Sequence, residues 1–74
     1  MIKYIKYNGK KILVLEEKHY VIFGRYIENV NGIPTAKYIV MLPMQIGKKK
    51  KVIVFGESES SKIMYMLFKR LTSY

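Results

Sequence analysis

The chain has 74 residues, half of them apolar, and carries 14 Lys or Arg against five Glu and no Asp, which gives a formal net charge of +9. This length allows one small domain, and the apolar content excludes a disordered basic tail. The absence of Cys excludes a disulfide framework, and no apolar run is long enough to span a bilayer.

The first local signal along the chain is Asn8-Gly9, because both residues tolerate the positive φ angles of a two-residue hairpin turn. This turn predicts two paired strands, at residues 1–7 and 10–16. In the resulting register Ile5 lies opposite Ile12, and both faces of the hairpin carry apolar side chains. We therefore expect this hairpin to be covered on both sides or wrapped into a barrel.

A second hairpin follows a polar break at residues 16–18. Its strands are expected at residues 19–28 and 35–42, joined by a turn at Asn31-Gly32. Pro34 is expected at the edge of the loop, because proline has no N–H to donate to a neighbouring strand.

The two faces of this second hairpin differ in character. One face is strongly apolar and is the expected core, with Val21, Phe23, Arg25 and Ile27 opposite Leu42, Val40, Tyr38 and Ala36. The other face is mixed, and it carries Ile22, Gly24, Tyr26, Glu28, Lys37, Ile39 and Met41. Within this strand, the lack of a side chain at Gly24 predicts a bulge or a sharp bend.

A third hairpin is expected to close between Pro43 and Gly47 and to lead into a strand at residues 49–55. The first half of this strand consists of lysines, and its second half, residues 52–55, is apolar. Gly56 is expected to end it.

The last element is predicted to be a helix at residues 58–72. Ser58 is the expected N-cap, and Glu57 and Glu59 suit the positive end of the helix dipole. The period of the apolar residues changes to that of a helix, and the expected buried stripe is Ile63, Met64, Leu67, Phe68 and Leu71.

Together these elements predict a single α+β domain over residues 1–74: a small antiparallel five-stranded β-meander with one C-terminal α-helix packed on it. One amphipathic helix covers only one face of such a sheet. The other face must be solvated, curled into a partial barrel or buried by a second copy of the chain.

Catalysis is not expected, because the chain offers no group of residues able to carry it. His19 is the only His, and a zinc site cannot be assembled from one His, no Cys and no Asp. No glycine-rich phosphate-binding motif is present. We therefore predict no catalytic residue, no metal and no cofactor.

The charge excess predicts an anionic partner, and its clustering at Lys48, Lys49, Lys50 and Lys51 favours phosphate contacts over a solvated strand end that discourages edge pairing. Tyr26 and Lys37 could stack a base and hold a phosphate, although a purely structural cross-strand pair is the favoured explanation of these two residues. Beyond the lysine run, the expected nucleic-acid contacts are Lys10, Lys11, Arg25, Tyr26, Lys37, Lys69 and Arg70.

The main functional hypothesis is a small basic nucleic-acid-binding protein acting on DNA, in an intracellular location, with a composition that suggests a virus or plasmid. The alternative is an interaction module, an adaptor or inhibitor, that docks on an acidic protein. Attachment to anionic lipid ranks last, because the helix is short and its apolar stripe is needed for the core. An exposed apolar patch at Tyr65, Met66 and Tyr74 suggests a homodimer.

Overall fold

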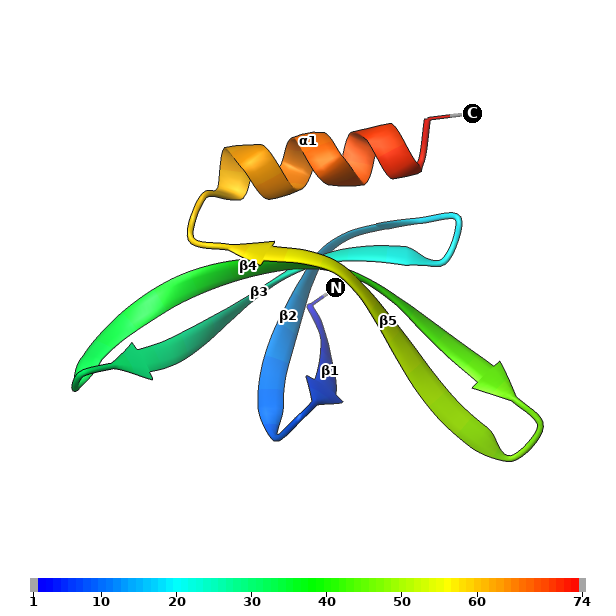
Figure 1. Cartoon of the computed structure of the whole chain (residues 1–74), viewed down its shortest axis with the longest axis horizontal. Coiled ribbons are helices and arrows are strands. Elements are labelled where there is room, and N and C mark those ends of the chain that lie inside the picture. Colours follow the sequence, from blue (N-terminus) through cyan, green and yellow to red (C-terminus); the bar gives the residue numbers. More distant parts are fainter. Residues whose placement is uncertain (1, 74) are drawn as a thin grey trace.

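The computed structural model describes residues 2–73 and contains five strands followed by one helix (Figure 1). Met1, which the predicted first strand included, and Tyr74, which the predicted apolar patch included, lie outside the described residues. The elements are β1 (Lys3–Tyr7), β2 (Lys10–Lys18), β3 (Val21–Val30), β4 (Ile33–Ile46), β5 (Lys49–Ser58) and α1 (Ser61–Leu71).

The strands form one antiparallel sheet in the order β1-β2-β3-β4-β5, which confirms the predicted meander with a C-terminal helix. The turns at Asn8-Gly9 and Asn31-Gly32 have positive φ angles throughout, from 50° to 81°. They set the predicted registers, with Ile5 opposite Ile12 and, in the second hairpin, Phe23 opposite Val40.

The connection between β2 and β3 differs from the prediction. The expected polar break at residues 16–18 continues β2, and the turn lies at His19 and Tyr20, whose φ angles are 52° and 68°. A bulge between Val14 and Glu16 adds one residue to β2, so the alternation of side chains changes within the strand. The prediction that a strand begins at residue 19 was therefore wrong.

Both prolines lie inside β4, which is much longer than the predicted strand at 35–42. Pro34 lies opposite Asn29 of β3, in a pair that is not hydrogen-bonded because the neighbouring pair at the turn is. Its nitrogen therefore points away from β3, toward the β5 side of β4. No strand is paired there, because β5 ends opposite Tyr38. Pro43 faces Val52 of β5, and its nitrogen points to the side on which β3 pairing ends at Met41. Neither missing N–H interrupts a ladder, so exclusion from the strand was a wrong expectation.

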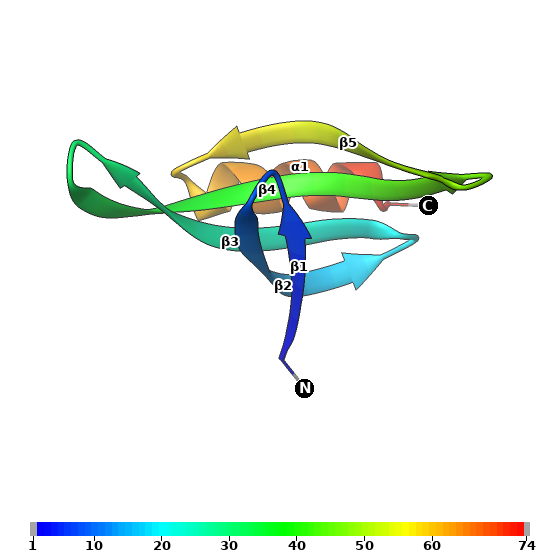
Figure 2. The ribbon, with the colours of Figure 1, turned by 90° about the horizontal axis from the view of Figure 1, so that it is seen from below.

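The helix covers one face of the sheet and lies on the side opposite β1 (Figures 1 and 2). Phe68 of α1 is fully buried on the side of the helix that faces the sheet, and the centre of its ring lies 6.0 Å from the centre of the Phe23 ring. The core beneath α1 consists of Val21, Phe23, Val40, Met64 and Phe68.

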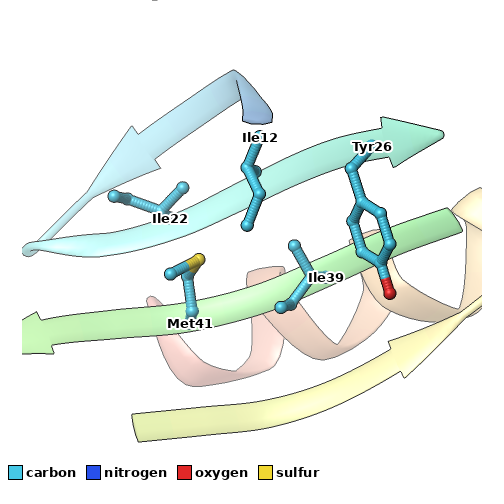
Figure 3. Packing of buried hydrophobic residues seen from close by; sticks show 5 residues of the cluster. All are labelled: Ile12, Ile22, Tyr26, Ile39 and Met41. Atoms are coloured by element: carbon cyan, nitrogen blue, oxygen red, sulfur yellow. The ribbon is translucent and has the colours of Figure 1, made fainter. Parts of the chain in front are cut away.

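The opposite face has a core of its own, which the prediction of a mixed face did not anticipate. Its fully packed residues are Ile12, Ile22, Tyr26, Ile39 and Met41 (Figure 3). They are buried without a covering helix because the sheet curls and β1 folds over this side, so the strands enclose their own side chains. Of the three arrangements considered for this face, the curled sheet is the one observed.

Gly24 permits this curl through close packing instead of a bulge. A Cβ atom at this position would lie 2.5 Å from Cγ2 of Ile12, so no larger residue fits without moving β2. The bulges fall elsewhere, in β2 before Glu16 and in β5 at the residue between Val54 and Gly56.

The helix begins later than predicted. Ser60 is the N-cap, and its hydroxyl accepts a hydrogen bond from the backbone N–H of Ile63 at 3.2 Å. Ser58 instead belongs to β5 and accepts a bond from the N–H of Ser60. Glu57 also lies in β5, so its predicted place at the helix start was wrong. Ile63, expected in the buried stripe, is exposed because the core side of α1 is centred on Met64 and Phe68.

Candidate nucleic-acid interface

The last part of β4 and the first part of β5 form a two-stranded extension of the sheet, which we call the β4–β5 arm (residues 42–53). Pairing between β3 and β4 ends at Met41, so only β5 accompanies β4 beyond that point, from Leu42 opposite Ile53 to Ile46 opposite Lys49. The arm projects away from α1 (Figure 1). Every residue from 43 to 51 is exposed.

The lysine run lies at the tip and along one strand of this arm. Lys48 follows Gly47 in the turn, and the first three residues of β5 are Lys49, Lys50 and Lys51. Because side chains alternate along a strand, Lys50 shares a face with Val52, on the side opposite α1, whereas Lys49 and Lys51 point to the helix side. The run therefore presents positive charge on both faces of the arm.

A cleft of about 430 Å³ separates the arm from β1. Its floor is apolar and includes Ile5, Met41 and Val52, and Lys6 and Lys50 also line it. Lys6 was not among the contacts expected from the sequence, since it lies far from the lysine run along the chain. Only the curl of the sheet brings the two segments together.

The glutamates lie away from the arm. Two ion pairs join described residues, Lys3 with Glu17 at 3.2 Å and Lys37 with Glu28 at 3.0 Å, and neither involves a lysine of the arm. The other carboxylates are also placed elsewhere: Glu16 accepts a hydrogen bond from Tyr65, Glu57 accepts one from Tyr26, and Glu59 lines a separate cleft with Lys37. The positive charge of the arm is thus not neutralised locally.

Tyr26 and Lys37 do not form the exposed stacking site that the sequence suggested. Tyr26 is only 3% exposed, and its hydroxyl donates a hydrogen bond to Glu57. Burial, followed by the bond to Glu57, raises the pKa of Tyr26 well above its ordinary value. The Nζ atom of Lys10 lies 4.6 Å from the centre of the same ring. A base has no access to this ring, so the stacking role was wrong.

Lys37 is occupied by an acidic neighbour. The hydrogen bond and the charge of Glu28 raise the pKa of Lys37, and Lys37 in turn lowers the pKa of Glu28. Lys10, Tyr26, Lys37 and three glutamates line one cleft of about 440 Å³, in which charges of both signs are mixed. This cleft is a weaker site for a polyanion than the arm.

The remaining predicted contacts are spread over the surface. Lys11 lies over the ring of Tyr4 at 4.3 Å, and Lys69 lies 5.9 Å from the ring centre of Tyr65. Arg25 is half-buried in β3, and Arg70 lines an apolar hollow on the helix. The structure therefore groups the lysine run with Lys6 and leaves these four residues apart from that group.

Within residues 2–73 there is no cluster of three or more His, Asp or Glu side chains that could hold a metal ion. The same residues include no helix with the length and apolar character that a membrane span requires. Comparison with protein-family models, curated proteins and solved structures finds no match for this chain.

Proposed function

We propose that this protein binds duplex DNA through the β4–β5 arm. The observation that carries the proposal is the run Lys48–Lys51 on a projecting two-stranded ribbon, with no glutamate paired to it among the described residues. When unpaired lysines on such a surface contact a phosphate backbone, they release its condensed counterions, and this release contributes favourable free energy of binding.

The shape of the arm supports the choice of duplex DNA. A two-stranded β-ribbon fits the major groove, where it can reach base edges while its flanking lysines meet phosphates. Ile46, next to the turn, is 62% exposed and lies opposite Lys49. An apolar side chain at this position can contact thymine methyl groups or press against a base step.

Lys6 extends the basic surface across the cleft beside the arm. It lines this cleft together with Lys50, over an apolar floor. A sugar-phosphate backbone that follows the arm would meet this third strand as well. Lys6 is therefore a contact that we add to the predicted set, while Tyr26 is removed from it because its ring is buried.

The test is fluorescence anisotropy with labelled duplex DNA between about 50 and 200 mM salt, the range over which multi-phosphate contacts lose affinity steeply. We expect Lys49→Ser, Lys50→Ser and Lys51→Ser, combined in one chain, to weaken binding on every sequence and to reduce the log–log salt slope by about 0.9 per lost contact. The matched control removes the same charge from the helix, at Lys62, Lys69 and Arg70, and should retain most of the affinity.

Equal binding by the arm variant and by the unmodified protein would show that the arm is not the interface. Single-stranded DNA and RNA of the same length are measured in parallel, because a preference for either would overturn the choice of duplex. If no nucleic acid binds even at the lowest salt, the basic surface is a docking face for an acidic protein. Co-purification of such a protein in stoichiometric amount would then support the alternative function.

A further inference from the structure

Strand β5 lies at one end of the sheet order, and its outer edge is open. Among the described strands it is hydrogen-bonded only to β4, and Figure 2 shows it as the outermost strand on that side. It is ten residues long, whereas β1, at the other end of the sheet, has five. A long strand with unpaired N–H and C=O groups is a template for pairing with another chain.

The sequence of β5 and the residues next to it is electrostatically self-complementary in the antiparallel direction. Residues 48–51 are all basic, residues 52–55 are all apolar, and Glu57 and Glu59 follow. Two copies aligned antiparallel place the basic half of one opposite the acidic half of the other, with the apolar centres together. A parallel alignment would instead place lysines opposite lysines, which is unfavourable.

The bulge in β5 defines the register of this pairing. Ile53 faces Leu42 of β4, so its backbone groups point inward, and those of Val52 and Val54 point to the open edge. A two-fold axis at Ile53 pairs Val52 with Val54 of the second copy. Because the bulge adds one residue after Val54, Lys50 then lies opposite Glu57 of the second copy, and both lie on the face opposite α1.

Exposed apolar side chains next to this edge supply the rest of an interface. Ile53 and Phe55 of β5 are partly exposed on the chain that forms the edge, and Met66 on α1 is 62% exposed. A hollow on the helix, lined by Ile63, Met66, Leu67 and Arg70, adjoins β5, since Leu67 lies against Gly56. A second sheet continuing from β5 would bring its own helix to this side and cover these side chains.

We propose that two copies of this protein associate through their β5 edges in an antiparallel, two-fold symmetric dimer centred on Ile53. The pairing joins the two meanders into one continuous sheet of ten strands and sets Lys48 opposite Glu59 of the second copy. Lys49 and Lys51 stay on the helix side and remain free of these ion pairs. The inference rests on β5 alone, and the dimer is an alternative to DNA binding by the two-stranded arm, because it covers the β5 edge and pairs Lys48 and Lys50 with glutamates of the second copy.

The absence of Cys from the chain allows a direct test with single cysteines. Residues that face each other at the axis have Cα atoms about 4.5 Å apart in a pair without hydrogen bonds, within the range that a disulfide spans. We expect Ile53→Cys to form a covalent dimer under mild oxidation, seen on a non-reducing gel. Ile27→Cys, on the exposed part of β3, is the control and should remain monomeric.

A charge exchange tests the register without relying on a crosslink. Lys48→Glu and Glu59→Lys each place like charges opposite one another, so sedimentation equilibrium should show the dimer Kd rising about tenfold in either variant. The double variant restores opposite charges and should recover the original Kd. A double variant no tighter than the single ones would overturn the register. An unmodified protein that sediments as a monomer at every concentration would overturn the dimer itself.

Discussion

The body of the sheet and the β4–β5 arm are built from the same two strands, yet they differ in almost every physical property. In the body, Ile39, Val40 and Met41 of β4 are at most 1% exposed. Two residues farther along the same strand, from Pro43 onward, every side chain is exposed. The charges differ in the same way, because glutamates and lysines neighbour each other around Tyr26, whereas the lysines of the arm have no acidic partner.

This difference teaches that stability and recognition are separated along one strand. The body buries apolar surface on both faces of the sheet, which is how so short a chain gains enough burial to fold. The arm adds little to that burial, so its sequence can be chosen for charge. Substitutions should therefore act on stability in the body and on binding in the arm.

The largest contrast is expected between Phe68→Ala in the body and Ile46→Ala in the arm. Phe68 is 0% exposed and contacts Phe23, so its loss should cost about 3–5 kcal/mol, much of the stability of a small domain. Ile46 is largely exposed, and its loss should change the free energy of unfolding by less than about 0.5 kcal/mol. Urea unfolding followed by circular dichroism measures both. Equal effects of the two substitutions would contradict the separation of body and arm.

Gly24→Ala should have the next largest effect. The added Cβ would approach Cγ2 of Ile12 to 2.5 Å and the backbone oxygen of Leu13 to 3.1 Å, so β2 must shift. Overpacking of this kind costs about 1–3 kcal/mol. Gly56→Ala is the matched control, since its nearest neighbours are flexible side-chain atoms of Leu67 and Met64. In thermal unfolding, the Tm of Gly24→Ala should be clearly lower than the Tm of Gly56→Ala.

The features that could be predicted from sequence are those determined by local chemistry. Asn8-Gly9 and Asn31-Gly32 define their turns because few other residue pairs accept positive φ twice in succession. These turns set the registers of two hairpins and hence the meander. The lysine run and the helix could be predicted equally well from the sequence, because neither depends on a distant part of the chain.

The features that could not be predicted arise where distant segments meet. His19 and Tyr20 form a turn without Gly or Asn, and the bulge that shifts β2 has no local signal. Tyr26 is buried only because the sheet curls and brings Glu57 to its hydroxyl. The same curl places Lys6 beside the arm. Strand alternation alone assigned these residues to a face, but it did not indicate how that face was covered.

Tyr26→Phe tests the hydrogen bond between Tyr26 and Glu57 and should have a moderate effect on the free energy of unfolding. Removing the hydroxyl deletes the hydrogen bond to Glu57 and should cost about 0.5–1.5 kcal/mol. The pKa of Tyr26 is raised in the folded protein, so the unfolded chain loses this proton first as the pH rises through 10.0. Unmodified protein should therefore lose stability above that pH more steeply than Tyr26→Phe. Parallel alkaline slopes for the two proteins would show that the raised pKa makes no contribution.

The ion pair between Glu28 and Lys37 should have the smallest effect, because both side chains are partly exposed and solvent screens their attraction. Lys37 lowers the pKa of Glu28, so the stabilisation is present above the ordinary pKa of this carboxyl and is lost as the pH falls through the lowered value. Glu28→Gln should accordingly be slightly less stable than unmodified protein at neutral pH and equal to it in acid. Lys37→Gln removes the same pair from the other side and should be less stable at neutral pH by a similar amount.

Thermal unfolding at pH values on both sides of this transition measures the difference. A deficit of Glu28→Gln that persists unchanged in acid would mean that packing of the side chain, and not its charge, stabilises this part of the body. The arm offers no counterpart to this experiment, since none of its lysines has a carboxylate partner among the described residues.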